Sequence, residues 1–309
     1  MYLKNVKFAV QLLVEGFSYQ EILEIARKVE SLGFDILTMP DHFYPMMLPR
    51  RENVLESWVT IASLLRDTNK LMIGPLVTCT AYRYPSVLAK MVASLDHISS
   101  GRVNFGIGAG WYEEEYIGYG IPFPKPKVRM EMLREAIMII KKMWTEEKAT
   151  FEGKYFKIKD AVCFPKPHQK PYPPIMIGTG GEKYGLRVAA ELADKWNWFG
   201  SPETYRRKVD ILMNYCKEVE RDFDEITLTW TGRIIVVGNE REKEEIAKKY
   251  LWRNITPQEY VERNIVGTEE EVIDKINYFI DELGVREFYT SFTKGTSITE
   301  LERISRILL

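Results

Sequence analysis

One of the three histidines of the chain lies in a short polar segment that directly follows a predicted strand. Asp41 and His42 belong to the segment Met39-Pro40-Asp41-His42-Phe43, which comes after the apolar run 34–39. Imidazole titrates near pH 6.5, so His42 could accept or donate a proton at neutral pH, and Asp41 could hydrogen-bond a ligand or a backbone amide. A loop histidine satisfied by its neighbours is the structural alternative. Its place directly after a strand favours a catalytic His42.

Three glycine-rich segments also stand at the ends of predicted strands. Gly74-Pro75-Leu76-Val77-Thr78-Cys79-Thr80 places glycine and proline inside a buried strand, which indicates either a kink or a bulge against a ligand, because proline cannot donate to a sheet. Gly106-Ile107-Gly108-Ala109-Gly110-Trp111 would let backbone amides approach a flat ring or a phosphate, although its spacing is not that of a dinucleotide motif. Gly178-Thr179-Gly180-Gly181 precedes a predicted helix, whose N-terminus favours an anion; an ordinary tight turn is the alternative.

The remaining reactive side chains give no further motif. His97 ends a predicted helix and is interpreted as structural, and His168 in a proline-rich segment is left unassigned. No HxH, HExxH or GxSxG spacing occurs, so neither a metal site nor a serine nucleophile is expected. The three cysteines, Cys79, Cys163 and Cys216, are widely spaced and indicate free thiols in a reducing compartment.

Short apolar runs and longer amphipathic stretches alternate along the chain, and they would position these motifs. Strands are predicted at 6–13, 34–39, 71–78, 102–109, 175–178, 195–199, 226–237 and 286–292. Helices are predicted from Ser18, where Glu21 completes a capping box, to Gly33, and at 56–66, 86–98, 128–144, 183–193, 202–219 and 297–309, with charged helical material between the last two strands. Eight strand–helix units predict a (β/α)8 barrel, with a doubly wound open sheet as the alternative. In such a barrel the four motifs would meet at the face where the strands end.

Composition sets the class of protein. The chain has 309 residues, 43 Lys+Arg and 44 Asp+Glu, hence a net charge of −1, and 45% of its residues are hydrophobic. This composition is typical of a globular protein. The chain has no excess of basic residues, so a nucleic-acid partner is not indicated. No apolar run approaches the roughly 18 residues of a membrane span. No signal peptide is visible, so a cytoplasmic protein is expected. We predict one domain over 1–309, with an insertion at about 149–174 that starts as a hairpin around Gly153.

Three segments resemble the bacterial luciferase-like superfamily of flavin- and deazaflavin-dependent oxidoreductases. They are GPLVTCTAYRYPSVLAKMVASLDHISSGRVNFGIGAGW, ADKWNWFG and VGTEEEVIDKINYFIDELGVREF, and the resemblance covers nearly the whole chain. It implies a (β/α)8 barrel with insertions, usually a homodimer, that holds a flavin-type ring where the strands end. Within the superfamily, the segment PDHF resembles the branch that uses coenzyme F420, a 5-deazaflavin.

The resemblance implies roles for single residues. His42 matches a histidine that lies against the deazaflavin and serves as acid or base, and a non-proline cis peptide is implied at Leu76–Val77. The implied cofactor contacts are Asp41, Leu76, Val77, Cys79, Ala109, Gly110, Trp111, Gly178, Thr179, Gly180 and Gly181. Some F420-dependent sugar-phosphate dehydrogenases have a catalytic glutamate where Trp111 stands here, and the acidic residues come only at 113–115. A sugar-phosphate activity is therefore not carried over.

The function implied is hydride transfer between coenzyme F420 and a small organic substrate. An FMN-dependent monooxygenase of the luciferase type and a non-catalytic deazaflavin- or flavin-binding protein remain alternatives. The predicted pocket lining is Gln11, Tyr44, Trp58, Trp111 and Trp198, and the cations placed by loop position to meet the acidic cofactor tail are Arg50, Arg51, Lys125 and Lys127. A homodimer is expected through 58–65 and 86–98.

Overall fold

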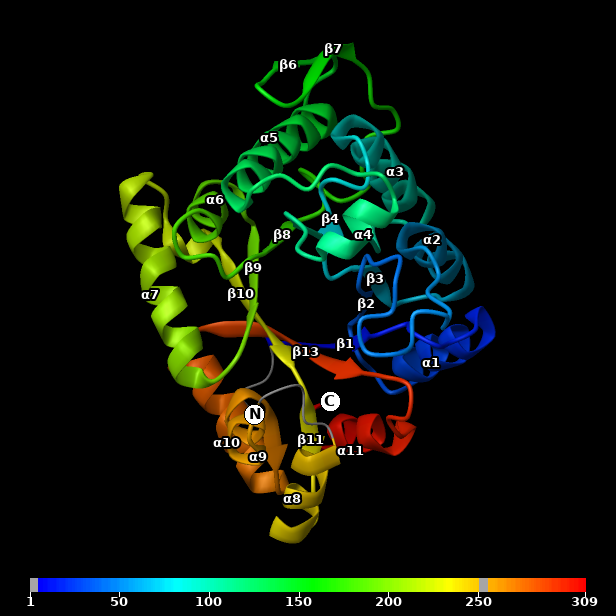
Figure 1. Ribbon diagram of the computed structural model, residues 1–309, viewed down its shortest axis with the longest axis vertical. Helices are drawn as coiled ribbons and strands as arrows, with labels where there is room; N and C mark the ends of the chain where they lie inside the picture. Colours follow the sequence, from blue (N-terminus) through cyan, green and yellow to red (C-terminus); the bar gives the residue numbers. More distant parts are fainter. Residues whose placement is uncertain (1–4, 250–254) are drawn as a thin grey trace.

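The strands of the central sheet form a nearly closed parallel barrel (Figure 1). The computed structural model describes residues 5–249 and 255–309. The barrel strands are β1 (Lys7–Leu12), β2 (Ile36–Met39), β3 (Met72–Pro75), β4 (Thr78–Cys79), β5 (Phe105–Gly108), β8 (Ile175–Gly178), β9 (Lys195–Phe199), β10 (Thr227–Gly232) and β13 (Val285–Phe292). Their order is β3-β2-β1-β13-β10-β9-β8-β5-β4, and every pairing is parallel. β3 and β4 are two halves of one strand position, and an isolated bridge between Ile73 and Val103 joins its first half to the segment before β5, so the sheet is nearly closed. The predicted (β/α)8 barrel is confirmed.

The helices surround this barrel (Figure 1). They are α1 (Tyr19–Ser31), α2 (Ser57–Asp67), α3 (Pro85–Ile98), α4 (Glu113–Gly118), α5 (Pro126–Thr145), α6 (Gly185–Leu192), α7 (Pro202–Glu218), α8 (Glu240–Lys249), α9 (Pro257–Arg263), α10 (Glu269–Asp281) and α11 (Ile298–Leu308), with a 3₁₀ turn η1 (Phe223–Glu225). The predicted capping box begins α1: the Ser18 hydroxyl accepts from the Glu21 amide, and the Glu21 carboxylate accepts from the Ser18 amide. None of the described helices has the length and apolar character of a membrane span.

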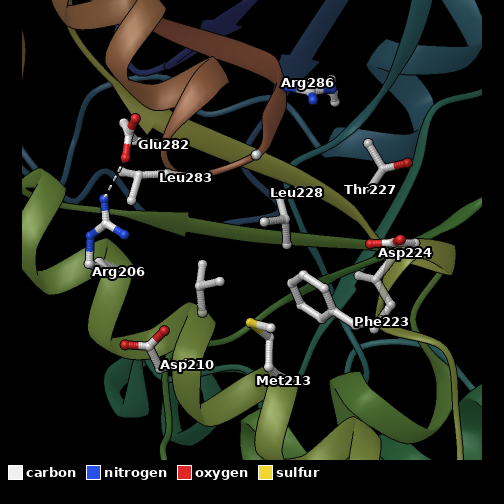
Figure 2. A pocket seen from close by; sticks show the side chains of 13 residues that line it. Arg206, Asp210, Met213, Phe223, Asp224, Thr227, Leu228, Glu282, Leu283 and Arg286 are labelled. Atoms are coloured by element: carbon white, nitrogen blue, oxygen red, sulfur yellow. Dashed lines mark ion pairs between the residues drawn. The ribbon is translucent and has the colours of Figure 1, made fainter.

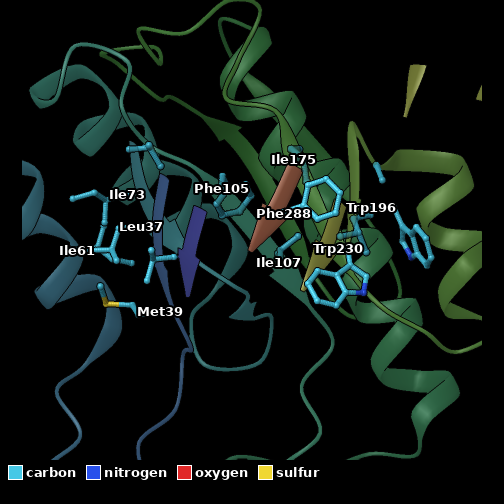
Figure 3. Close-up of a cluster of buried hydrophobic side chains, with 14 of the residues drawn as sticks. Leu37, Met39, Ile61, Ile73, Phe105, Ile107, Ile175, Trp196, Trp230 and Phe288 are labelled. Atoms are coloured by element: carbon cyan, nitrogen blue, oxygen red, sulfur yellow. The ribbon is translucent and has the colours of Figure 1, made fainter. Parts of the chain in front are cut away.

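The main hydrophobic core fills the layer between strands and helices (Figure 3). Strand residues alternate between this layer and the barrel interior, where a smaller cluster joins Ala9, Ile36, Leu76, Met176 and Tyr289. Trp58 belongs to the outer layer: it is 1% exposed, packs near the ring of Phe105, and donates its indole N–H to Thr78 Oγ1. The prediction that Trp58 lines the pocket is therefore wrong, because an apolar helical face packs inward against the sheet.

The predicted seventh strand, 226–237, is wrong in its second half. β10 ends at Gly232, and the chain then forms β11 (Ile234–Val236), which pairs with β12 (Ile265–Gly267) in a separate two-stranded sheet. A continuous apolar run does not reveal such a break, because Ile234 donates its amide to the Thr290 hydroxyl instead of continuing the barrel ladder. The charged helical stretch predicted after it contains α8, α9 and α10, and its residues 250–254 lie outside the described part of the chain, as do residues 1–4.

The predicted insertion starts with a hairpin of two antiparallel strands. β6 (Ala149–Glu152) and β7 (Lys157–Ala161) turn around Gly153 and project beyond α5 at one edge of the molecule (Figure 1). The helix predicted from residue 183 begins slightly later, at Gly185, so the turn 178–181 is separated from it by a short further turn. The site below therefore rests on β2, β4, β5 and β8 and the loops that leave them.

Candidate functional site

A histidine–glutamate pair lies at the face where the barrel strands end. His42 follows β2, and Glu115 lies on α4, in the loop region after β5. His42 Nδ1 lies 2.8 Å from Glu115 Oε2, and the two side chains are 14% and 0% exposed. His42 Nε2 makes no hydrogen bond to any of the described residues. This ring nitrogen is therefore the one available to a ligand.

The Glu115 carboxylate is enclosed by donors. Its Oε1 accepts the backbone amides of Phe43 and Tyr44 at 2.8 and 2.9 Å, and its Oε2 also accepts the Tyr82 hydroxyl at 2.5 Å. Burial opposes ionisation, yet the hydrogen bonds from His42, Tyr82 and the backbone outweigh it and hold the pKa of Glu115 below its usual value. The carboxylate is thus charged at neutral pH and fixes the loop that carries His42.

The acidic residues of this segment were given no role from the sequence, so Glu115 as a partner of His42 was missed. The two residues are 73 positions apart, and α4 was not predicted. The order Glu113-Glu114-Glu115 also gave no means to choose among three carboxylates. Glu114 is exposed and pairs with Arg50 at 2.6 Å, whereas Glu115 alone is buried. Helical spacing, which turns Glu115 and Tyr116 inward together, is the signal that could have separated them.

Asp41, a predicted cofactor contact, is held within the protein. The Arg83 guanidinium binds its carboxylate with both terminal nitrogens, at 2.6 and 3.0 Å. The same carboxylate accepts from the Thr78 hydroxyl and the Cys79 amide, and Arg83 also contacts Glu56, which precedes α2. A buried bidentate pair of this kind fixes geometry strongly. The network joins the exit of β2 to β4, and Arg83 was not recognised from the sequence.

The third strand position breaks at Leu76 and Val77. The predicted cis peptide between these residues is present. The Val77 side chain fills space beside three strand glycines: a Cβ at Gly106, Gly108 or Gly178 would lie within 2.8–3.0 Å of its methyl carbons. Gln11 on β1 donates to the Leu76 carbonyl oxygen at 3.5 Å and accepts from Ser291. The interior near the strand ends therefore combines an apolar bulge with polar side chains.

Cys79 and the Ala109–Gly110 segment meet at a buried tyrosine. Cys79 Sγ lies 3.0 Å from the Tyr116 hydroxyl, which also donates to the Ala109 carbonyl oxygen at 3.1 Å. Burial raises the pKa of the Cys79 thiol to about 11, so it is protonated at neutral pH. Gly110 has φ +75°, and a Cβ there would lie 1.9 Å from the Tyr116 hydroxyl oxygen. Only glycine fits this turn.

The turn 178–181 brings an unsatisfied hydroxyl to the N-terminal end of α6. Thr179 is 5% exposed, and its Oγ1 finds no hydrogen-bond partner among the described residues. Gly185, the first residue of α6, is close: a Cβ built there would lie 2.0 Å from this oxygen. Lys208 on α7, which the sequence analysis missed, donates to the Gly180 carbonyl oxygen at 2.7 Å and is also paired with Glu182. The turn can accept an anion.

Several aromatic rings lie on the loops at the strand-exit face. Trp111 is 59% exposed, stacks on Tyr112 at 5.3 Å, and lies edge-on to His42 at 5.6 Å. Trp198, also predicted to line the pocket, packs on Gly180, where a Cβ would lie 2.0 Å from its ring. Tyr44 stacks under the Arg50 guanidinium at 4.0 Å. The other predicted tail-binding cations, Arg51, Lys125 and Lys127, are exposed.

A cavity of about 560 Å³ lies at the other end of the barrel (Figure 2). Its lining includes Leu228 and Arg286, from the beginnings of β10 and β13, and Arg206 and Met213, from α7. Arg206 is engaged across it with Glu282 at 3.7 Å. This hollow lies on the side where the strands start, so it is separate from the His42 site.

Comparisons with known proteins give one family model, and the solved structures of similar fold include both F420-dependent enzymes and monooxygenases. A model of the family described as luciferase-like monooxygenase matches residues 5–287. An uncharacterized protein of Mycobacterium tuberculosis is 32% identical over 186 residues, covering 55% of this chain and 64% of that protein, which is less than two thirds of its length. The F420-dependent glucose-6-phosphate dehydrogenase of Microbacterium testaceum is 29% identical, covering 91% of this chain and 90% of that one. A solved F420-dependent secondary alcohol dehydrogenase, in complex with an F420–acetone adduct, matches with TM-score 0.83 at 21% identity over 98% of both chains, which shows a shared fold.

Proposed function

Because the chain belongs to the luciferase-like monooxygenase family, we propose that it is a coenzyme F420-dependent oxidoreductase acting on a small organic substrate. The observation that carries the proposal is His42, held at the strand-exit face by a buried carboxylate with Nε2 left for a ligand. The relatives and the structural neighbour whose names specify F420 support this cofactor over FMN.

The residues of the site fit such a cofactor. Thr179 Oγ1 is a buried polar atom without a partner in the described chain, beside the N-terminus of α6, and a phosphate would supply one. Gly180 and Gly181 would add backbone N–H groups to the same anion. Leu76, Val77, Cys79, Ala109 and Gly110 would form the apolar support for a ring, with Trp111 at its edge. Asp41 would act by holding Thr78 and Cys79 in place through its own hydrogen bonds.

His42 would manage the proton of the reaction. When bound, F420 would supply the hydride chemistry, and oxidation of an alcohol would then leave the hydroxyl proton for the protein to take. His42 Nε2 would accept that proton, or return one when a carbonyl is reduced. The aromatic rings of Trp111 and Tyr112 would exclude water from this transfer.

Fluorescence titration of the pure protein with F420 and with FMN tests the proposal. We expect F420 to bind at least about tenfold more tightly, a difference of about 1.4 kcal/mol. Equal or tighter FMN binding, with oxygen-dependent NAD(P)H consumption once a flavin reductase is supplied, would indicate the monooxygenase instead. F420 binding without turnover on any of a panel of alcohols, aldehydes, ketones and activated alkenes would indicate a non-catalytic binding protein.

We also propose that this single-domain chain forms an isologous homodimer in the cytoplasm. Val59 on α2 and Val87 on α3 are exposed, on the two segments that the sequence indicated for pairing. Cys79, Cys163 and Cys216 are buried free thiols, which suits a reducing compartment. Light scattering at micromolar concentration should give the mass of a dimer, and a monomer would contradict the pairing.

A further inference from the structure

We propose that Glu115 is the positioning residue that fixes the tautomer of His42, so that the neutral imidazole carries its proton on Nδ1 and offers Nε2 as the acceptor. The catalytic use of this tautomer rests on the proposed function, but the tautomer itself is a property of the free protein. A base whose free nitrogen faces the ligand is what proton removal from an alcohol needs.

The geometry around Glu115 assigns the proton to Nδ1 of His42. An ionised carboxylate has no hydrogen to donate, so Nδ1, 2.8 Å from Glu115 Oε2, must be the donor. Glu115 Oε1 receives two backbone amides, from Phe43 and Tyr44, so this oxygen also acts only as an acceptor. The Tyr82 hydroxyl, which has Oε2 as its partner, is a third donor to the same group. All four contacts agree with an anion that only accepts.

The lowered pKa of Glu115 supports this arrangement. A protonated Glu115 could instead donate to Nδ1 and reverse the tautomer, but the donors around it favour the charged form. Burial also matters for precision, since the Glu115 side chain is fully enclosed and cannot change its rotamer without breaking the amide contacts at Phe43 and Tyr44. The ring orientation and the proton position are therefore set together.

Glu115→Gln tests the inference because the amide has a preferred orientation here. The two backbone N–H groups at the Oε1 position require the amide oxygen there. The NH₂ group then takes the Oε2 position and faces Nδ1, so it must donate to that nitrogen. The neutral imidazole would consequently carry its proton on Nε2. The substitution keeps the size of the side chain but should exchange donor and acceptor on the histidine.

Solid-state NMR of protein labelled with ¹³C,¹⁵N-histidine, recorded on the neutral imidazole form at alkaline pH, reads out the tautomer. The chain has only three histidines, and His42→Asn identifies the His42 signals by their loss. In the wild type we expect a protonated Nδ1 and a bare Nε2, and in Glu115→Gln the reverse. Glu114→Gln is the matched control: it removes the neighbouring exposed carboxylate and should leave the wild-type tautomer.

Two results would overturn the inference: a wild-type His42 protonated on Nε2, or a folded Glu115→Gln protein that keeps the wild-type tautomer. If Glu115→Gln does not fold, the wild-type spectrum still decides. The outcome is distinct from that of the F420 titration, because the spectra are recorded without cofactor or substrate. A protein with the expected tautomers that does not bind F420 would remove the proposed function and leave the positioning role of Glu115 standing.

Discussion

Replacing Thr179 by valine should weaken F420 binding without weakening the fold. Thr179 Oγ1 is buried and has no partner within the described chain, so the free protein gains nothing from this hydroxyl. An unsatisfied buried polar group costs about 1–3 kcal/mol, and valine has the same shape without it. The free energy of unfolding should therefore stay the same or rise. A hydrogen bond from this hydroxyl to a phosphate is worth about 1.5–3 kcal/mol, so the Kd for F420 should rise about 10- to 150-fold.

Urea unfolding and fluorescence titration measure the two quantities separately. Thr60→Val is the matched control: Thr60 is also buried, but its hydroxyl donates to the Glu56 carbonyl oxygen at 2.8 Å, at the start of α2. It should lose about 1 kcal/mol of stability and keep its affinity for F420. The reasoning is refuted if Thr179→Val binds F420 as tightly as the wild type, or if it destabilises the protein as much as Thr60→Val does.

Three further predictions concern the proton, the wall of the barrel and acid stability. His42→Asn should lower kcat by about 10²–10⁴-fold while the Kd for F420 changes less than about fivefold, and loss of binding with turnover kept at saturation would make His42 a binding residue. Gly74→Ala would place a Cβ 1.6 Å from the Asn104 carbonyl oxygen, so the free energy of unfolding in urea should fall by several kcal/mol, on the order of the largest overpacking penalties. Gly238→Ala is the control: its Cβ would face only the flexible end of Glu242 at 3.3 Å and should be tolerated. The pKa of Glu115 in the folded protein lies below its usual value, so the charged carboxylate stabilises the fold above the ordinary carboxyl range, and this stabilisation is lost as the pH falls through the folded pKa. Between pH 6 and pH 3.5, the free energy of unfolding of Glu115→Gln should therefore fall less than that of Glu114→Gln. Equal losses in the two variants would contradict this.

The barrel and the face of the site could be predicted because both depend on local patterns. Apolar runs of strand length, the capping box at Ser18 and the glycines of the strand ends each act over a few residues. His42 could be placed at the strand-exit face for the same reason. The break between β10 and β11 and the short helix α4 could not be predicted, since each depends on a hydrogen bond or a packing contact that hydrophobic periodicity does not contain.

The partners of the site residues were beyond sequence reasoning for a different reason. Glu115 with His42 and Arg83 with Asp41 are pairs that form only when separate strand–helix units close into a barrel. From the sequence alone, a charged residue in a loop is assigned to the solvent-exposed surface, because its partner is not known. Trp58 shows the converse error, since an aromatic residue near the site in sequence was assigned to the pocket although it packs behind Thr78. Pairing across the fold is thus the information that one sequence lacks.

The packing of Val77 links positions that are far apart in the chain. Its methyl carbons occupy the space that side chains at Gly106, Gly108 and Gly178 would need, so the four residues share one fixed volume on three different strand positions. At Gly178 the atoms that a Cβ would meet all belong to Val77. A methyl group added at Gly178 therefore needs one to be removed at Val77. The double substitution should destabilise the fold less than the sum of the two single substitutions. We therefore expect these positions to covary, so that variation at Val77 would be accompanied by variation at these glycines.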